Sequence, residues 1–112
     1  MTGIQIALIR YALVAPIGDV GSESTPPIGL AYLSAIAKNQ GASVTGIDAS
    51  GRNLNKSFKI PKYNLQGNGL ELNEIFELIH PETKFIGVTA MFSHDWPYVR
   101  DCINATKEKF PN

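Results

Sequence analysis

The stretch of residues 26–48 most constrains what this chain can fold into. Pro26 and Pro27 fit the first turn of a helix, where a missing N–H costs no hydrogen bond, and Gly41 is a typical helix stop. A buried strand over residues 44–47 follows, and a nearly continuous apolar strand over residues 4–10 precedes. The unit is therefore strand, loop, helix, strand, which is the building block of a parallel sheet covered on both faces.

The rest of the chain continues this alternation. Residues 70–80 have one apolar helical face and are followed by Pro81, which ends helices. Residues 85–91 predict a third strand, and residues 96–109 predict a helix that Asp95 can cap. The inner stripe of that helix consists of Val99, Cys102, Ile103, Thr106 and Phe110. Such alternation favours right-handed crossovers, so we predict an α/β fold whose parallel sheet has the strand order 2-1-3.

Two features of the chain fit a regular domain less well. Residues 49–68 show no clear period and contain many Asn, Lys, Ser and Gly residues, so we expect a long variable loop. Three strands are also fewer than the ~4–6 of a usual sheet, and proteins avoid leaving an apolar edge exposed. We therefore expect residues 1–112 to be one partial domain, truncated before strand 4, unless a partner chain covers the edge.

Composition excludes several classes of function. The chain has 44% hydrophobic and 18% charged residues, which is typical of a globular protein, and its ten basic residues balance its ten acidic ones. We expect no nucleic-acid or membrane partner, because there is no basic patch and no apolar run of ~20 residues. The N-terminus does not resemble a signal peptide, so a cytoplasmic location is expected. The single cysteine excludes an internal disulfide and a multi-cysteine metal site, and we expect Cys102 to be a buried, inert thiol.

The long loop after the first strand is a candidate ligand site. It spans about residues 11–26, whereas a strand-to-helix loop usually has ~2–6 residues. Long loops at the carboxyl ends of parallel strands are where α/β proteins place ligands. A solvated Gly/Ser loop is the alternative interpretation. The candidate contacts are glycines and hydroxyl residues: Gly18, Gly21, Ser22, Ser24 and Thr25.

The end of the third strand adds further candidates. In the order 2-1-3, Thr89 and Ser93 lie beside the first loop, at the crevice between strands one and three. His94 could be a metal ligand or a base, but it lacks partners at metal spacing, so a solvated or capping histidine is favoured. Asp48 could bind a ribose, but the Rossmann and P-loop glycine motifs are absent, so a turn-capping role is favoured.

Three segments together resemble the N-terminal cobalamin-binding domain of radical SAM proteins. They are IQIALIR, PPIGLAYLSAIAKNQGASVTGID and FIGVTAMFSHDWPYVRDCINATKEKFPN, which cover most of the chain except residues 49–68. The resemblance implies a flavodoxin-like, three-layer fold with the corrinoid over the carboxyl ends of the strands and its nucleotide tail beside the sheet. By this resemblance the cobalamin contacts lie in two loops and comprise Gly18, Asp19, Gly21, Ser22, Ser24, Thr25, Thr89, Ala90, Met91 and Ser93.

The chain departs from the pattern of such proteins at two points. Many cobalamin domains carry D-x-H-x-x-G, whose histidine ligates cobalt from below, whereas residues 19–23 read DVGSE. Cobalamin is therefore expected to bind here without a protein histidine below the cobalt. The C-x-x-x-C-x-x-C motif is also absent, so SAM and a [4Fe-4S] cluster would belong to a missing downstream radical SAM domain. The chain by itself is then not an enzyme.

The resemblance implies that the chain is the cofactor-holding part of a methyltransferase or ring-forming radical SAM enzyme. Two alternatives remain from other functional classes. One is a flavodoxin-like interaction or receiver module, although strand one ends in Arg10-Tyr11 where a receiver needs acidic residues. The other is half of a nucleotide-binding enzyme.

Overall fold

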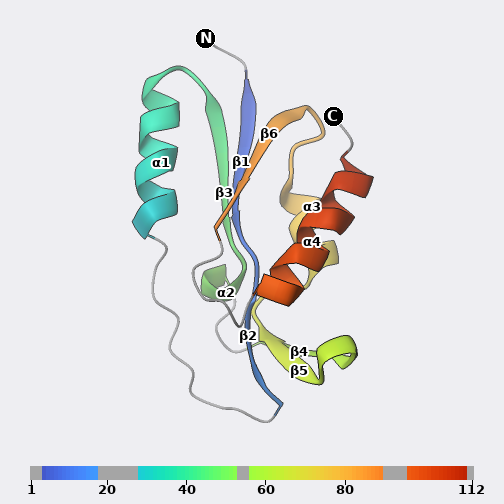
Figure 1. Cartoon of the computed structure of the whole chain (residues 1–112). Helices are drawn as coiled ribbons and strands as arrows, with labels where there is room; N and C mark the ends of the chain where they lie inside the picture. Colours follow the sequence, from blue (N-terminus) through green and yellow to red (C-terminus); the bar gives the residue numbers. More distant parts are fainter. Residues whose placement is uncertain (1–3, 18–27, 53–55, 90–95, 111–112) are drawn as a thin grey trace.

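A parallel three-stranded sheet forms the centre of the protein. The computed structural model describes residues 4–17, 28–52, 56–89 and 96–110. The sheet has the order β3–β1–β6 and consists of β1 (Gln5–Arg10), β3 (Ser43–Asp48) and β6 (Thr83–Val88) (Figure 1). Both neighbours run parallel to β1. The predicted strand order 2-1-3 is therefore confirmed, and the third strand begins two residues earlier than expected.

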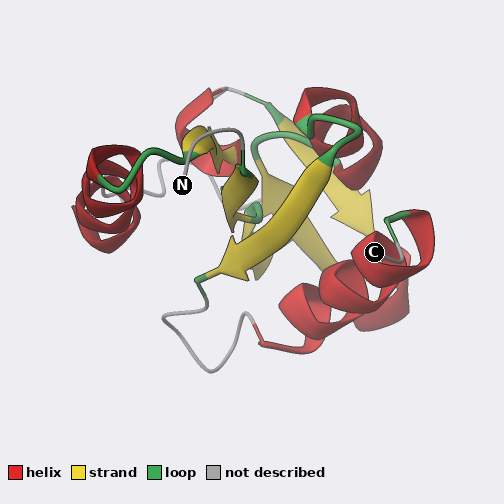
Figure 2. Ribbon diagram, turned by 90° about the horizontal axis from the view of Figure 1, so that it is seen from above, coloured by secondary structure: helices red, strands yellow, loops and turns green. Residues whose placement is uncertain are grey.

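Helices cover the two faces of this sheet in an unequal way. Helix α1 (Ile28–Asn39) lies on one side, and α3 (Leu72–Leu78) and α4 (Trp96–Lys109) lie on the other (Figures 1 and 2). The three layers are those of an α/β fold, and they are compatible with a flavodoxin-like arrangement. The bounds of α4 agree with the sequence prediction, whereas α3 is shorter than the predicted 70–80.

The end of α1 confirms the role predicted for Gly41. Its φ of 92° lies in the region that favours glycine. The Gly41 N–H donates to the Lys38 carbonyl at 3.0 Å, and the Ala42 N–H donates to the Ala37 carbonyl at 3.1 Å. These two bonds form a Schellman motif, which satisfies carbonyls that the helix itself leaves without donors and turns the chain into β3.

The prediction of one irregular loop over residues 49–68 is wrong. These residues contain α2 (Ala49–Arg52), β4 (Ser57–Ile60), the short 3₁₀ helix η1 (Pro61–Tyr63) and β5 (Leu65–Asn68). The first loop was expected to span about residues 11–26, but part of it forms β2 (Leu13–Pro16). Together they build a second, antiparallel sheet of order β2–β5–β4, which continues from the carboxyl end of β1 (Figure 1).

Local contacts explain why this second sheet forms. The turn between β4 and β5 depends on Asn64, which adopts a left-handed conformation with a φ of 54°. Gly67 lies against the Phe58 ring, so a Cβ there would come within 2.3 Å of the ring. The Ser50 hydroxyl accepts from the Leu13 N–H at 3.0 Å and donates to the Asn68 carbonyl at 2.6 Å. The two Ser50 hydrogen bonds join segments that lie far apart in the sequence, which periodicity alone does not detect.

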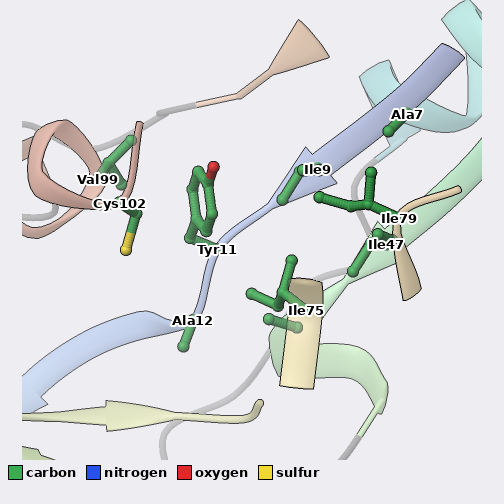
Figure 3. Packing of buried hydrophobic residues seen from close by; sticks show 10 residues of the cluster. Ala7, Ile9, Tyr11, Ala12, Ile47, Ile75, Ile79, Val99 and Cys102 are labelled. Carbon is green, nitrogen blue, oxygen red and sulfur yellow. The ribbon is translucent and has the colours of Figure 1, made fainter. Parts of the chain in front are cut away.

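The hydrophobic core lies between the parallel sheet and helices α3 and α4. Alternate residues of the strands point to this side, and Ile9 and Ile47 are almost fully buried there. Ile75 from α3 and the pair Val99 and Cys102 from α4 belong to the same cluster (Figure 3). The predicted inner stripe of α4 is confirmed, because its members are all buried or half-buried.

A buried hydrogen-bond chain connects β1 to α4. The Tyr11 hydroxyl lies 2.7 Å from Thr106 Oγ1, and Thr106 Oγ1 donates to the Cys102 carbonyl at 2.7 Å. Since the threonine hydroxyl has one proton, Tyr11 is the donor to Thr106. Burial raises the pKa of the Tyr11 phenol, so it stays protonated and keeps this role.

Helical spacing puts Leu30, Leu33 and Ala37 on one face of α1, which predicts a common inner face, and this prediction is only partly correct. Leu30 and Ala37 are half-buried as expected, but Leu33 is 55% exposed. The half-buried row is Leu30, Ser34 and Ala37, which has the spacing of one helical face. The helix packs mainly against the edge strand β3 and less against β1, so its larger apolar side chains remain in solvent.

Candidate functional site

The carboxyl ends of β1 and β6 form the topological switch point of the sheet. From β1 the chain crosses to β3 on one side and later returns to β6 on the other, with helices on opposite faces (Figure 1). Where the connections that follow two adjacent parallel strands run to opposite faces of a sheet, a crevice lies between them. Open α/β sheets bind their ligands in such a crevice. The strand order therefore places a candidate site at the end of the sheet that the sequence analysis selected.

Arg10 and Asp48 form an ion pair at this end of the sheet. Arg10 Nε donates to Asp48 Oδ1 at 2.8 Å, and Arg10 Nη2 donates to Asp48 Oδ2 at 3.0 Å. The two residues are register partners at the ends of β1 and β3, and their side chains are 13% and 24% exposed. The geometry is bidentate, which orients both groups.

This ion pair changes the interpretation of Asp48. The carboxylate is held by Arg10, which speaks against the ribose-binding role that the sequence left open. It also lies close to the backbone of α2, because a Cβ at Gly51 would come within 2.3 Å of Asp48 Oδ2. This pairing was not predicted, although an arginine and an aspartate that end adjacent parallel strands indicate it.

Thr89 is the one predicted contact that lies within the described residues. Its N–H donates to the Ile9 carbonyl at 3.1 Å, and the residue is half-buried directly after β6. This places it at the switch point, as predicted. The other predicted contacts lie outside the described residues: Gly18, Asp19, Gly21, Ser22, Ser24, Thr25, Ala90, Met91 and Ser93. His94 and the predicted cap Asp95 lie outside them as well.

The α1 side of the sheet has an open surface next to this edge. Gly46, Leu8 and Gly87 are register partners across the three strands. Among the described residues, a Cβ at Gly46 would meet no atom within 4 Å, so the described part of the chain leaves the surface there open. A Cβ at Gly87 would come within 2.8 Å of Leu8 Cδ2, so Gly87 makes room for the leucine. Gly46 therefore marks the place where a ligand could approach the backbone of the sheet closely.

Other residues considered from the sequence have structural roles. Burial raises the pKa of the Cys102 thiol to about 11, so the thiol stays protonated at neutral pH. Tyr98 packs against Phe58 with ring centroids 6.1 Å apart, and burial raises the pKa of its phenol. The prediction that Cys102 is buried is confirmed, and packing is the observed role of Tyr98. Trp96 is 47% exposed at the start of α4.

Neither a metal site among the described residues nor a similar known protein is found. Within residues 4–17, 28–52, 56–89 and 96–110, no three His, Cys, Asp or Glu side chains are grouped to hold a metal ion. In the same part of the chain, no helix has the length and apolar character needed to cross a membrane. Comparison with protein-family models, with curated proteins and with solved structures finds no significant match.

Proposed function

We propose that the chain is a cobalamin-binding domain that holds a corrinoid at the carboxyl ends of β1 and β6. The observation that carries this proposal is the strand order β3–β1–β6, with α1 and the pair α3 and α4 on opposite faces. In open α/β sheets that order favours a ligand crevice at the switch point, and the two loops of the sequence resemblance adjoin this point in the chain. Such a domain would serve as the cofactor-holding part of a radical SAM enzyme of the methyltransferase or ring-forming type.

An open surface among the described residues supports the proposal of a large ligand. The open surface at Gly46 lies on the α1 side of the sheet, next to the carboxyl edge. Exposed apolar side chains lie on this side too, since Phe85 is 62% exposed and is separated by one residue from Gly87. A nucleotide tail descending beside the sheet would find backbone and apolar surface there, which suits its mixed character.

Each described residue of the site has a specific role in this proposal. Thr89 would contact the corrinoid from the end of β6, and Gly46 would allow the tail to approach β3. The Arg10–Asp48 pair would keep the edge between β1 and β3 rigid, because both side chains are fixed by two hydrogen bonds. The corrinoid would supply methyl-transfer or radical chemistry, and the protein would bind and orient it.

The same edge argues against the alternative functions. A receiver needs free carboxylates at the end of the first strand, but Arg10 stands there and holds Asp48. A nucleotide-binding site of the Rossmann type needs an acidic residue at the end of the second strand to bind a ribose, and that residue is the Asp48 already bound by Arg10.

Titration with hydroxocobalamin, followed by calorimetry and by amide NMR of the ¹⁵N-labelled chain, tests the proposal. We expect one-to-one binding with shifts at Arg10, Gly46 and Thr89. Gly46→Leu should weaken binding by about tenfold, corresponding to roughly 1.4 kcal/mol, because it fills the open surface. Ser43→Leu is the matched control, since Ser43 is exposed at the other end of β3.

Two outcomes would overturn the proposal. The first is an absence of cobalamin binding at millimolar concentration. The second is binding that Gly46→Leu leaves unchanged and whose shifts lie away from the carboxyl edge. If ATP binds at this edge while hydroxocobalamin does not, the nucleotide-binding alternative replaces the proposal.

A further inference from the structure

Arg52 lies beside the open surface at Gly46. It ends α2, which follows β3 directly (Figure 1). Arg52 Nη2 donates to the Gly46 carbonyl at 3.3 Å, so the side chain reaches back along β3. The Ser43 N–H donates to the Ile4 carbonyl on the β1 side, and the backbone groups of successive residues in a strand point in opposite directions. The Gly46 carbonyl therefore points away from β1, and the hydrogen bond holds the guanidinium at the outer edge of the sheet.

The positive charge of Arg52 has no acidic partner in the part of the chain that the structure describes. Arg10 pairs with Asp48, and Lys56 pairs with Glu74. No ion pair among the described residues includes Arg52. A guanidinium has five N–H donors, and the bond to the β3 carbonyl uses one of them. The other donors can therefore bind a ligand while the contact with β3 is kept.

The chemistry of this edge suits a phosphate group. The planar fork of an arginine binds two oxygens of one phosphate at once, whereas a lysine acts as a point charge. No described residue fills the place of a Cβ at Gly46, so an anionic group can come close to the strand. Asp48 ends the same strand, but Arg10 holds its carboxylate and balances its charge. The edge therefore combines an unbalanced positive charge with open backbone.

We propose that Arg52 binds a phosphate ester of the ligand, which in cobalamin is the phosphodiester of the nucleotide tail. This inference rests on the proposed function and adds which group of the ligand the edge of β3 recognises. The site does not depend on further strands beside β6, because the second strand of a flavodoxin-like order stands at the outer edge of the sheet. In the alternative, purely structural role, Arg52 only covers a carbonyl of an edge strand.

Two corrinoids that differ in the phosphodiester test the proposal. Hydroxocobalamin contains it, whereas aquahydroxocobinamide lacks it together with the rest of the nucleotide tail. In calorimetric titrations, Arg52→Gln should weaken hydroxocobalamin binding about tenfold, because a charge-assisted hydrogen bond is lost, and should leave cobinamide binding unchanged. Arg52→Lys keeps the charge but loses the planar fork, so its affinity for hydroxocobalamin should lie between those of Arg52→Gln and the wild type.

Lys59→Gln is the matched control. Lys59 is exposed on β4 and belongs to no ion pair among the described residues, so this variant changes the net charge by the same amount at another place. It should leave the affinity for both corrinoids unchanged. Circular dichroism and urea unfolding check that each variant keeps the fold. In the wild type, the ¹⁵N NMR signal of the Arg52 Nε–H group should shift with hydroxocobalamin and not with the cobinamide.

AMP and adenosine separate a failure of this inference from a failure of the proposed function. Suppose that neither corrinoid binds, that AMP binds about tenfold more weakly to Arg52→Gln than to the wild type, and that adenosine binds both equally. The phosphate site then stands and the cobalamin proposal fails. If hydroxocobalamin binds with an affinity that Arg52→Gln does not change, the phosphate site fails and the cobalamin proposal stands.

Three further results would overturn the phosphate site. The first is an equal loss of affinity for both corrinoids in Arg52→Gln, which would mean that Arg52 acts only through the structure of the edge. The second is the same loss in Lys59→Gln, which would mean that the overall charge and not this position decides binding. The third is an absence of binding by hydroxocobalamin and AMP alike, which would overturn the cobalamin proposal as well.

Discussion

The two faces of the parallel sheet differ in how completely they are covered. Toward α3 and α4, Ile9 and Ile47 are buried in one cluster with side chains from both helices. Toward α1, Leu33 and Phe85 are 55% and 62% exposed, because the single helix on that side packs mainly against the edge strand β3. The closed face buries more apolar side chains and therefore contributes more hydrophobic stabilisation, whereas apolar surface stays exposed on the open face.

The largest predicted difference between the two faces is in the free energy of unfolding lost when one isoleucine on each face is replaced by alanine. Ile9→Ala should lower the free energy of unfolding by about 2–5 kcal/mol, because it leaves a cavity in a packed core. Ile36→Ala on α1 removes a side chain that is 48% exposed, so its effect should stay within about 0.5 kcal/mol. Urea unfolding followed by circular dichroism measures both changes, and equal losses would contradict the comparison.

The Arg10–Asp48 pair tests whether the open face has a rigid edge. The double-mutant cycle of Arg10→Gln and Asp48→Asn should give a coupling free energy of about 1–2 kcal/mol, between the values for exposed and buried pairs. The cycle is measured by urea unfolding of the wild type, both single variants and the double variant. A coupling near zero would mean that the pair does not stabilise this edge.

A smaller difference in the free energy of unfolding is expected between the phenylalanine variants of two tyrosines on opposite sides of the sheet. Tyr11→Phe removes the donor to Thr106 inside the core and should cost about 1 kcal/mol of unfolding free energy. Tyr32→Phe removes a hydroxyl from a side chain that is 70% exposed and should change nothing measurable. If thermal and urea unfolding show the same change for both variants, the buried hydrogen bond contributes no net stability.

The smallest predicted effect concerns the contacts between η1 and Asp101 of α4. The Tyr63 hydroxyl donates to Asp101 Oδ2 at 2.6 Å, and Lys62 pairs with the same oxygen at 3.0 Å. The Tyr63 hydrogen bond, and then Lys62, hold the pKa of Asp101 below its ordinary value of 3.8. This contribution to stability is fully present above pH 4 and is lost as the pH falls through the lowered pKa.

An NMR titration of the Asp101 side-chain carboxyl checks this prediction. Tyr63→Phe should raise the pKa of Asp101 toward its ordinary value, because the largest cause of the lowering is removed. Asp101→Asn should make unfolding less dependent on pH below pH 4. A pKa of Asp101 that does not change in Tyr63→Phe would show that the hydrogen bond is not formed in solution.

Sequence reasoning succeeded where a local pattern was sufficient. The three parallel strands, the stop at Gly41 and the inner stripe of α4 follow from apolar runs, a glycine and helical spacing. It failed over residues 49–68, because β4 and β5 are stabilised by contacts with β2 and Ser50 that are distant in the chain. It also placed Leu33 inside, since periodicity does not reveal where along the sheet a helix docks.

For the candidate site too, one part could be predicted from the sequence and another part is known only from the structure. The sequence alone determined its position, because alternating strands and helices in the order 2-1-3 bring the carboxyl ends of the first and third strands together. Only the tertiary structure decided that Asp48 is bound by Arg10, that no described residue covers Gly46, and that a groove lies between α4 and β6. The reason is physical: a local pattern specifies which elements form, whereas packing between distant segments decides which surfaces remain exposed.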